Sequence, residues 1–262
     1  MKRWMKIAIA AVIALPILWF GGIFVYAKVL NKADPTAESQ FEDLAAAAAT
    51  ATTAASTDTA AKATDTTVDP PAGGADPATT AAPAAANPLE GDWSVDGTSE
   101  IYVGYRVEEV LSGVNTTATG RSNQVTGSAV VNGLTVESAT FTVDVASITS
   151  DQSRRDDQFR GRIMETATFP TATFTLTQPI TLAAVPAEGE VIATPVVGNL
   201  ELHGVTREVS FDLQAFVSGG KITATGAIPV LFSDYAIQDP SLGPVSTEDN
   251  GLLEFLLVMA KA

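Results

Sequence analysis

The side chains that most often carry chemistry are scarce in this sequence. The chain of 262 residues holds one histidine, His203, and no cysteine. A hydrolytic triad would need that histidine beside a serine and a carboxylate. His203 instead precedes Gly204 between two strand-like runs, which is the place of a turn residue. Metal sites usually draw on several His, Cys or carboxylate ligands, and no such cluster stands out. We therefore expect no catalytic residue, no metal site and no cofactor.

Charge is concentrated in one short run, which comprises Arg154, Arg155, Asp156, Asp157, Arg160 and Arg162. The simpler interpretation is the solvated face of a helix. Alternatively, Arg155 or Arg160 closes the end of a barrel or binds an anionic headgroup, because a guanidinium forms strong charge-assisted hydrogen bonds with carboxylates and phosphates. No glycine-rich phosphate loop or nucleophile elbow appears in the sequence, so an enzyme is not expected.

The charged run belongs to a helix-compatible segment in a region that otherwise alternates like β-strand. Ser153 and Asp156 have the outline of a capping box, which would begin a helix at Ser153. Phe159 and Ile163 follow four residues apart, so both can face inward. Pro170 disfavours the α conformation at the residue before it and returns the chain to strand. The segment therefore looks like a helical plug or lid on a β-barrel.

The strands that would carry such a lid are indicated by period-two alternation. Ile101, Val103, Tyr105 and Val107 alternate with more polar or smaller residues. The alternation breaks at Glu109, where we expect a bulge or the end of the strand. Further strands are expected over residues 128–131, 135–144, 171–177, 191–202, 205–217, 221–230 and 252–259. Asn-Gly at 132–133, His-Gly at 203–204 and Gly-Gly at 219–220 are typical of tight turns between them.

About eight strands joined mostly by short turns indicate an all-β, antiparallel domain. A closed barrel of this size leaves room for one apolar ligand. A sandwich of the same strands would fill its own centre with side chains. Periodicity alone does not separate the two.

Composition divides the chain into a basic N-terminus and an acidic body. The formal net charge is −15 and 46% of the residues are apolar. Residues 1–32 contain five basic and no acidic residues, which leaves 10 basic and 30 acidic residues elsewhere, a net charge of −20. Such a body would repel the phosphates of nucleic acid. The apolar content is sufficient for a sizeable core.

The N-terminal segment is expected to be a membrane anchor. Residues 7–27 carry no charge, and at 1.5 Å per residue a helix of this length spans roughly 30 Å. Lys2, Arg3 and Lys6 precede it and favour a cytoplasmic N-terminus. We expect a single pass through the cell membrane with the C-terminal domain outside the cytoplasm. The alternative is a signal peptide, with secretion after cleavage near Ala27.

Residues 33–88 are rich in Ala, Thr, Pro and Asp. Such a segment buries too little apolar surface to offset the entropy of ordering it, so we expect a disordered linker, with partial helix over the Ala-rich residues 40–51. The expected organisation is thus an anchor region at 1–32, a linker at 33–88 and a β-barrel domain at 89–262.

Four segments of the third region carry recognisable motifs. They are Trp93-Ser94-Val95-Asp96 with Tyr105-Arg106-Val107; Ser147-Ile148-Thr149 with Arg155-Asp156, Phe169-Pro170 and Phe174; Gly198-Asn199-Leu200-Glu201-Leu202-His203-Gly204-Val205-Thr206; and Ser233-Asp234-Tyr235-Ala236-Ile237. In order and spacing they resemble the YceI-like family of polyisoprenoid-binding proteins. The resemblance spans nearly all of residues 89–262 and implies a lipocalin-like extended β-barrel.

The chain departs from the family pattern at three places. Glu109 stands where many members have a histidine, Phe232 where an arginine is frequent, and Ala236 where glycine is usual. A headgroup contact through those positions is therefore not carried over. The anchored form with a long Ala/Thr tether resembles the membrane-anchored actinobacterial branch.

The resemblance implies that the barrel holds a long apolar chain, such as an isoprenoid or another long-chain lipid. Candidate pocket residues, chosen as inward-facing, are Tyr105, Val143, Phe159, Phe174, Leu200, Phe211, Phe232 and Phe255. The same side chains could equally serve as ordinary core. The alternative function is a filled β-domain that acts at the cell surface as an interaction module without bound lipid.

Overall fold

The computed structural model describes residues 34–58 and 87–262. The predicted anchor over residues 7–27 lies outside this part of the chain. No helix within the described residues is long and apolar enough to cross a membrane.

Strands dominate the described residues. They are β1 (Gly91–Val95), β2 (Tyr102–Leu111), β3 (Val114–Ser122), β4 (Val125–Asn132), β5 (Thr135–Asp144), β6 (Thr171–Leu176), β7 (Ile180–Thr181), β8 (Ile192–Leu202), β9 (Val205–Ser218), β10 (Lys221–Leu231), β11 (Val245–Thr247) and β12 (Asn250–Lys261). The helices are α2 (Ala37–Asp58) and α3 (Ser153–Gln158), the 3-10 turns η2 (Val145–Ser147) and η4 (Phe232–Tyr235), and the π-helix η3 (Phe159–Ile163).

Eight of the strands close into an antiparallel barrel. The ring runs β1-β4-β5-β6-β8-β9-β10-β12, and β12 pairs back onto β1. The β2–β3 hairpin pairs with the first half of β12, and β11 extends β2. This closure satisfies the strand edges that an open sheet would expose. The expectation of an antiparallel barrel of about eight strands is confirmed.

The predicted turns lie between the expected strands. Gly133 and Leu134 join β4 to β5, one residue beyond the predicted Asn132-Gly133 turn, because Asn132 still pairs with Thr135. Residues 203–204 join β8 to β9, as predicted. His203 and Gly204 both have positive φ, 51° and 73°. Two successive positive φ values belong to the turn type that matches the twist of a hairpin. His203 is therefore a turn residue, as predicted.

Two strand predictions differ from the structure. β2 does not end at Glu109 but continues in unbroken register with β3 to Leu111. Glu109 keeps the inward-facing phase of the strand because Arg155 supplies a partner for its carboxylate. β3 was not expected, since it is rich in threonine and lacks apolar alternation. Its nine paired positions with β2 compensate for that weak pattern.

The helix begins at Ser153, as predicted, but the predicted capping box is absent. α3 is capped by Gln152, with no side-chain hydrogen bond at the cap. Asp156 instead accepts hydrogen bonds from the backbone N (2.8 Å) and the Oγ (2.7 Å) of Ser150. The carboxylate thereby holds the preceding loop rather than the helix start. The helix then widens into the π-helix η3, which places Phe159 in the core.

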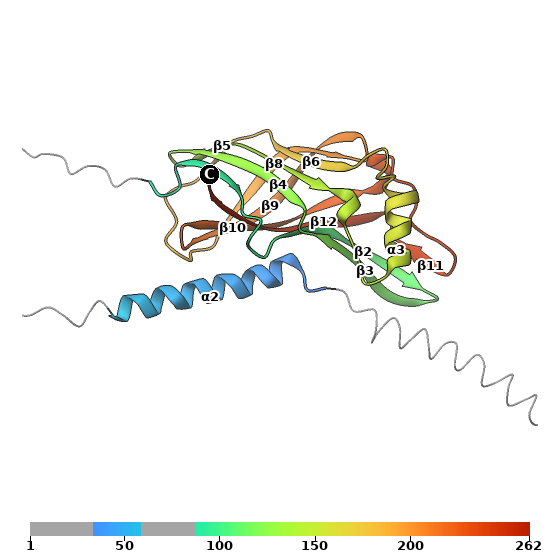
Figure 1. Cartoon of the computed structure of the whole chain (residues 1–262), viewed down its shortest axis with the longest axis horizontal. Coiled ribbons are helices and arrows are strands. Elements are labelled where there is room, and N and C mark those ends of the chain that lie inside the picture. The colour runs from blue at the N-terminus through green and yellow to red at the C-terminus, as the bar shows by residue number, and fades with distance from the viewer. Residues whose placement is uncertain (1–33, 59–86) are drawn as a thin grey trace, which may run out of the picture.

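Within the predicted linker over residues 33–88, α2 is an ordered helix, and it contains residues 40–51, where partial helix was expected. This helix lies along the outside of the barrel (Figure 1). Phe41 is 1% exposed and packs at 5.1 Å between ring centroids against Phe216 of β9, in a cluster with Tyr102 and Leu256. Alanine has the highest helix propensity, and this contact supplies the burial that composition alone did not predict.

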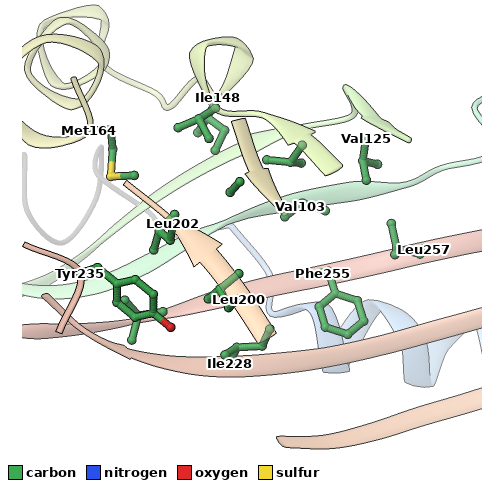
Figure 2. Close-up of a cluster of buried hydrophobic side chains, with 14 of the residues drawn as sticks. Val103, Val125, Ile148, Met164, Leu200, Leu202, Ile228, Tyr235, Phe255 and Leu257 are labelled. Carbon is green, nitrogen blue, oxygen red and sulfur yellow. The ribbon is translucent and has the colours of Figure 1, made fainter. Parts of the chain in front are cut away.

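The main core fills the barrel interior. Val103 from β2, Leu200 from β8 and Phe255 from β12 point toward a shared space (Figure 2). Met164 and Tyr235 lie toward one end of this cluster. At that end α3 and η3 cross the barrel opening (Figure 1).

Candidate functional site

The barrel interior contains two adjoining cavities. The outer cavity, of about 470 Å³, lies beneath α3 and η3, and the inner cavity, of about 190 Å³, lies deeper in the barrel. Val103, Val143, Ala172 and Leu253 line both. The two spaces therefore meet at these four side chains. Together they lie in the size range of small-molecule sites.

The inner cavity is lined almost entirely by apolar side chains. Phe174, Phe211 and Phe255 form a chain of edge-to-face contacts, with centroid separations of 5.6 and 5.8 Å. Glycines in the neighbouring strands make room for these rings. A Cβ at Gly226 would lie 2.8 Å from the Phe255 ring, so any side chain there would force this ring to move. A wall of this kind offers dispersion contacts and no hydrogen bonds, which suits hydrocarbon.

The outer cavity combines apolar walls with a polar end. Tyr105 of β2 stacks on Phe159 of η3 at 5.0 Å between centroids. The Tyr105 ring lies against Gly120 of the neighbouring strand, where a side chain would collide with it. Burial raises the pKa of Tyr105 to about 12, so the phenol stays neutral at physiological pH. Phe232 lines the same cavity.

Charged groups gather where the outer cavity meets α3. The Nη2 of Arg155 lies 3.5 Å from the Oε1 of Glu109, and both side chains are largely buried. Burial raises the pKa of Glu109, and the nearby Arg155 opposes the shift. Arg154 also lines the cavity but is exposed, and no partner is found for it among the described residues.

The other arginines tie the helical cover to neighbouring loops. Arg160 donates to the carbonyl oxygen of Ile148 at 3.1 Å. Arg162 donates to the carbonyl oxygens of Asp239 (2.9 Å) and Pro240 (2.8 Å). The prediction of a merely solvated helix face is therefore wrong for Arg155, Arg160 and Arg162, because each bonds across the end of the barrel.

All eight residues predicted for the pocket line one of the two cavities. Phe174, Leu200, Phe211 and Phe255 line the inner cavity; Tyr105, Phe159 and Phe232 line the outer one; Val143 lines both. That these side chains bind lipid stays a prediction. Period-two alternation placed the strand residues correctly, since it reports which face of a strand points inward.

Several lining residues were missed by sequence reasoning. Glu109 continues the inward phase of Tyr105 and Val107, so the strand phase was a usable signal for it. Met164 directly follows η3 and Leu242 lies in a loop, and no periodicity marks the inward face at either place. They are positioned by the tertiary fold alone.

The single histidine has a structural environment. The His203 Nδ1 lies 3.0 Å from the carbonyl oxygen of Tyr235. Its ring packs edge-on against the Phe169 ring, with 4.5 Å between the ring centroids. These contacts hold the β8–β9 turn against η4. Within residues 34–58 and 87–262, no group of three or more His, Asp or Glu side chains could hold a metal ion.

Comparison with solved structures finds similar barrels. A polyisoprenoid binding domain from Saccharophagus degradans, implicated in plant cell wall breakdown, has a TM-score of 0.54 at 23% identity and covers 65% of this chain and 98% of that domain. BcnA from Burkholderia cenocepacia has a TM-score of 0.47 at 22% identity and covers 63% of this chain and 98% of its own. A comparison with curated protein sequences finds no match.

The sequence itself matches a known domain family. The family described as "YceI-like domain" matches residues 93–259, from the buried Trp93 of β1 to Met259 of β12. This range contains six strands of the closed barrel in full and most of β1 and β12, together with the principal walls of both cavities. The chain therefore belongs to the YceI-like domain family.

Proposed function

We propose that this protein binds one long apolar lipid chain, isoprenoid-like in character, inside its barrel. The observation that carries the proposal is the pair of adjoining cavities, one of them almost wholly apolar. Membership of the YceI-like family supports it. So does the barrel of the Saccharophagus degradans domain, which is described as polyisoprenoid binding.

Affinity in such a site comes from burial of hydrocarbon. Each CH₂ removed from water contributes about 0.8 kcal/mol. The tail would lie along the phenylalanine wall of the inner cavity, with its polar end toward Glu109, Arg154 and Arg155 in the outer cavity. Binding and release need no bond to be made or broken. The function proposed is therefore carriage or sequestration, with no catalysis.

The cavities weigh against the alternative of a filled interaction domain, which would have a solid interior. We further propose that residues 7–27 anchor the protein in the cell membrane, with the barrel outside the cytoplasm. The support is their uncharged length and the basic residues Lys2, Arg3 and Lys6 before them. Secretion after cleavage near Ala27 is the alternative outcome for this part of the proposal.

The test compares lipid retained by matched variants of the full-length protein. Wild type, Phe211→Asp and Asp212→Asn are purified in the same detergent, extracted with organic solvent and analysed by mass spectrometry. Phe211 points into the inner cavity, while Asp212 next to it is exposed. Lipid that surrounds an anchor is common to all three proteins, so the difference between variants isolates the pocket.

We expect about one isoprenoid or other long-chain lipid per barrel in wild type and Asp212→Asn. Phe211→Asp should lose it, because a carboxylate in an apolar cavity is strongly disfavoured. Near-ultraviolet circular dichroism establishes that the variant is folded. Equal retention by a folded Phe211→Asp, or no lipid in wild type after incubation with membrane lipids, would reject the proposal.

A further inference from the structure

The outer barrel surface beneath α2 is a built interface. Phe41 of α2 is buried against Tyr102, Phe216 and Leu256, which come from β2, β9 and β12. Tyr102 and Leu256 line neither cavity, whereas Phe216 also borders the inner one. Two aromatic rings and a leucine would form an exposed apolar patch without the helix. Leu44 of the same helix is exposed and stands outside this cluster. α2 is thus held to the barrel by one defined face.

The residues just before α2 are held by two arginines. The Nη2 of Arg106 donates to the carbonyl oxygen of Asp34 at 2.8 Å, and Arg121 donates to the carbonyl oxygen of Pro35. Arg106 is itself fixed by a 2.7 Å ion pair with the buried Glu254. Arg121 lies over the Tyr102 ring at 4.0 Å. The chain therefore has a fixed position on the barrel from Asp34 onward.

Because the chain is fixed to the barrel from Asp34 onward, the segment between the proposed anchor and the barrel is much shorter than a linker that ends at residue 88. The uncharged run ends at Ala27, seven residues before Asp34. Seven residues reach about 25 Å when fully extended. If residues 7–27 lie in the membrane, as proposed above, Asp34 is within about 25 Å of its surface. The barrel is then close to the bilayer instead of far out on a linker that ends at residue 88.

The end of the barrel near Asp34 is also the end that opens. α2 begins toward α3 and β11 and runs to the opposite end of the barrel (Figure 1). Ala49, in its later part, lies against Gly189 in the loop before β8. The outer cavity lies beneath α3 and is lined by the exposed Leu242 and Arg154. The anchored side and the cavity opening therefore coincide.

Exposed apolar side chains gather at that same end. Of the seven large apolar residues that are exposed in the described part of the chain, four belong to it: Val110, Leu231, Leu242 and Leu252. We call these four residues the mouth patch. Val110 and Leu231 lie at the ends of β2 and β10, Leu252 is paired with Arg106, and Leu242 bridges to Val245 of β11.

From these observations we infer that the mouth patch is a bilayer-contacting surface, which rests on the membrane in which the chain itself is anchored. The inference rests on the proposed membrane anchor. Acidic residues Glu108, Glu248 and Asp249 lie near the patch together with Arg154 and Arg162. The contact is therefore made by apolar burial and does not require anionic lipid. In this position a lipid tail passes from the bilayer to the outer cavity without crossing water.

The chain has no cysteine, so single labelling sites can be introduced. Full-length Leu242→Cys and Val191→Cys are labelled with an environment-sensitive fluorophore and reconstituted in phosphatidylcholine vesicles that contain doxyl-labelled lipid. Val191 is exposed to a similar degree, 45% against 46%, but precedes β8 at the far end of the barrel. We expect the probe at position 242 to be quenched several-fold more than the probe at position 191.

Two helix variants test whether α2 sets this orientation. Phe41→Asp in the Leu242→Cys background should reduce quenching to the level at position 191, because it removes the buried contact. Leu44→Asp adds the same charge on the exposed face and should leave quenching unchanged. Equal quenching at positions 242 and 191, or no effect of Phe41→Asp, would overturn the inference.

Flotation of the vesicles after an alkaline carbonate wash separates this inference from the proposals on which it depends. Protein that floats but shows equal quenching rejects the mouth patch while the anchor stands. Protein that fails to float rejects both the anchor and the orientation. Lipid retention, measured by extraction as above, reports on the pocket independently of either result.

Discussion

At the scale of single residues, the pair of Glu109 and Arg155 distinguishes this barrel interior from a purely apolar one. Glu109 occupies an inward position between Val107 and Leu111. Its carboxylate is compensated by Arg155 at 3.5 Å. Loss of Arg155 would leave the buried carboxylate of Glu109 without its counter-ion, which is strongly destabilising, whereas Arg155 also pairs with Asp151. The pair therefore places a polar boundary in the outer cavity, at the open end of the proposed lipid site.

The raised pKa of Glu109 predicts a specific pH dependence. Above its ordinary value of 4.5, the unfolded carboxyl releases its proton while the buried carboxyl retains it. The unfolded state then binds fewer protons, so the free energy of unfolding falls as pH rises through this interval. Below pH 4.5 the carboxyl is protonated in both states, so the ionisation of Glu109 does not reduce the free energy of unfolding there. Glu109→Gln removes this dependence because the amide does not titrate.

Urea unfolding of wild type and Glu109→Gln from pH 4 to pH 8 measures the effect. We expect the variant to gain stability relative to wild type as pH rises. Glu137→Gln, on the outer surface of β5, is the matched control and should follow wild type. A constant difference between wild type and Glu109→Gln across the range would mean that Glu109 titrates normally.

At the scale of elements, α3 and η3 form a short helical cover over the barrel end. Hydrogen bonds from its arginines to neighbouring loops hold this cover in place, because the helix is too short to be stable alone. Six residues of α-helix are too few to be stable in isolation. Phe159 anchors the cover from inside, and Arg160 and Arg162 bond to loops on either side. A cover with so few fixed points is suited to open while the barrel stays closed.

Arg162→Ala should loosen this cover, because it removes two hydrogen bonds from a charged donor to backbone carbonyls. Such bonds contribute about 1.5–3 kcal/mol each, and less where solvent reaches them. We expect a fluorescent long-chain lipid to dissociate several-fold faster, as followed by stopped-flow transfer to acceptor vesicles. Asp157→Asn, on the exposed face of α3, is the control. Identical dissociation rates for wild type and Arg162→Ala would exclude the cover from control of release.

At the scale of the whole molecule, the junction between the two cavities would limit the length of a lipid chain bound as proposed. Ala172 of β6 lines both and is buried between them. A larger side chain there would fill the junction while the barrel ring stays intact. The outer cavity would then be the only space open to a lipid tail.

Ala172→Phe is therefore expected to shift retained lipids to shorter chains and to weaken the binding of the longest ones. Mass spectrometry after incubation with a homologous series of prenols measures this distribution. Thr175→Phe adds a similar ring to the exposed side of the same strand and should retain the wild-type distribution. An unchanged chain-length profile for a folded Ala172→Phe would place the bound tail within one cavity only.

The sequence by itself determined which face of each strong strand points inward and where the chain turns after β8 and after β9. Alternation in β2, β5 and β9 is a local property, and it placed Tyr105, Val143 and Phe211 at the cavities. Positive φ at His203 and Gly204 follows from their place between two strands. The family motifs extend the same local information over residues 89–262.

Only the tertiary structure decided the features that depend on distant partners. β12 pairs with β1, although nearly the whole domain separates the two strands in sequence, and this pairing closes the sheet into a barrel. Arg155 meets Glu109 from a sequence separation of 46 residues, and so an apparent strand end becomes a buried ion pair. Phe41 docks on Phe216 and orders a helix whose composition resembles a linker. Local pattern reports which side of an element is apolar, whereas the partner that covers that side is set by closure of the whole fold.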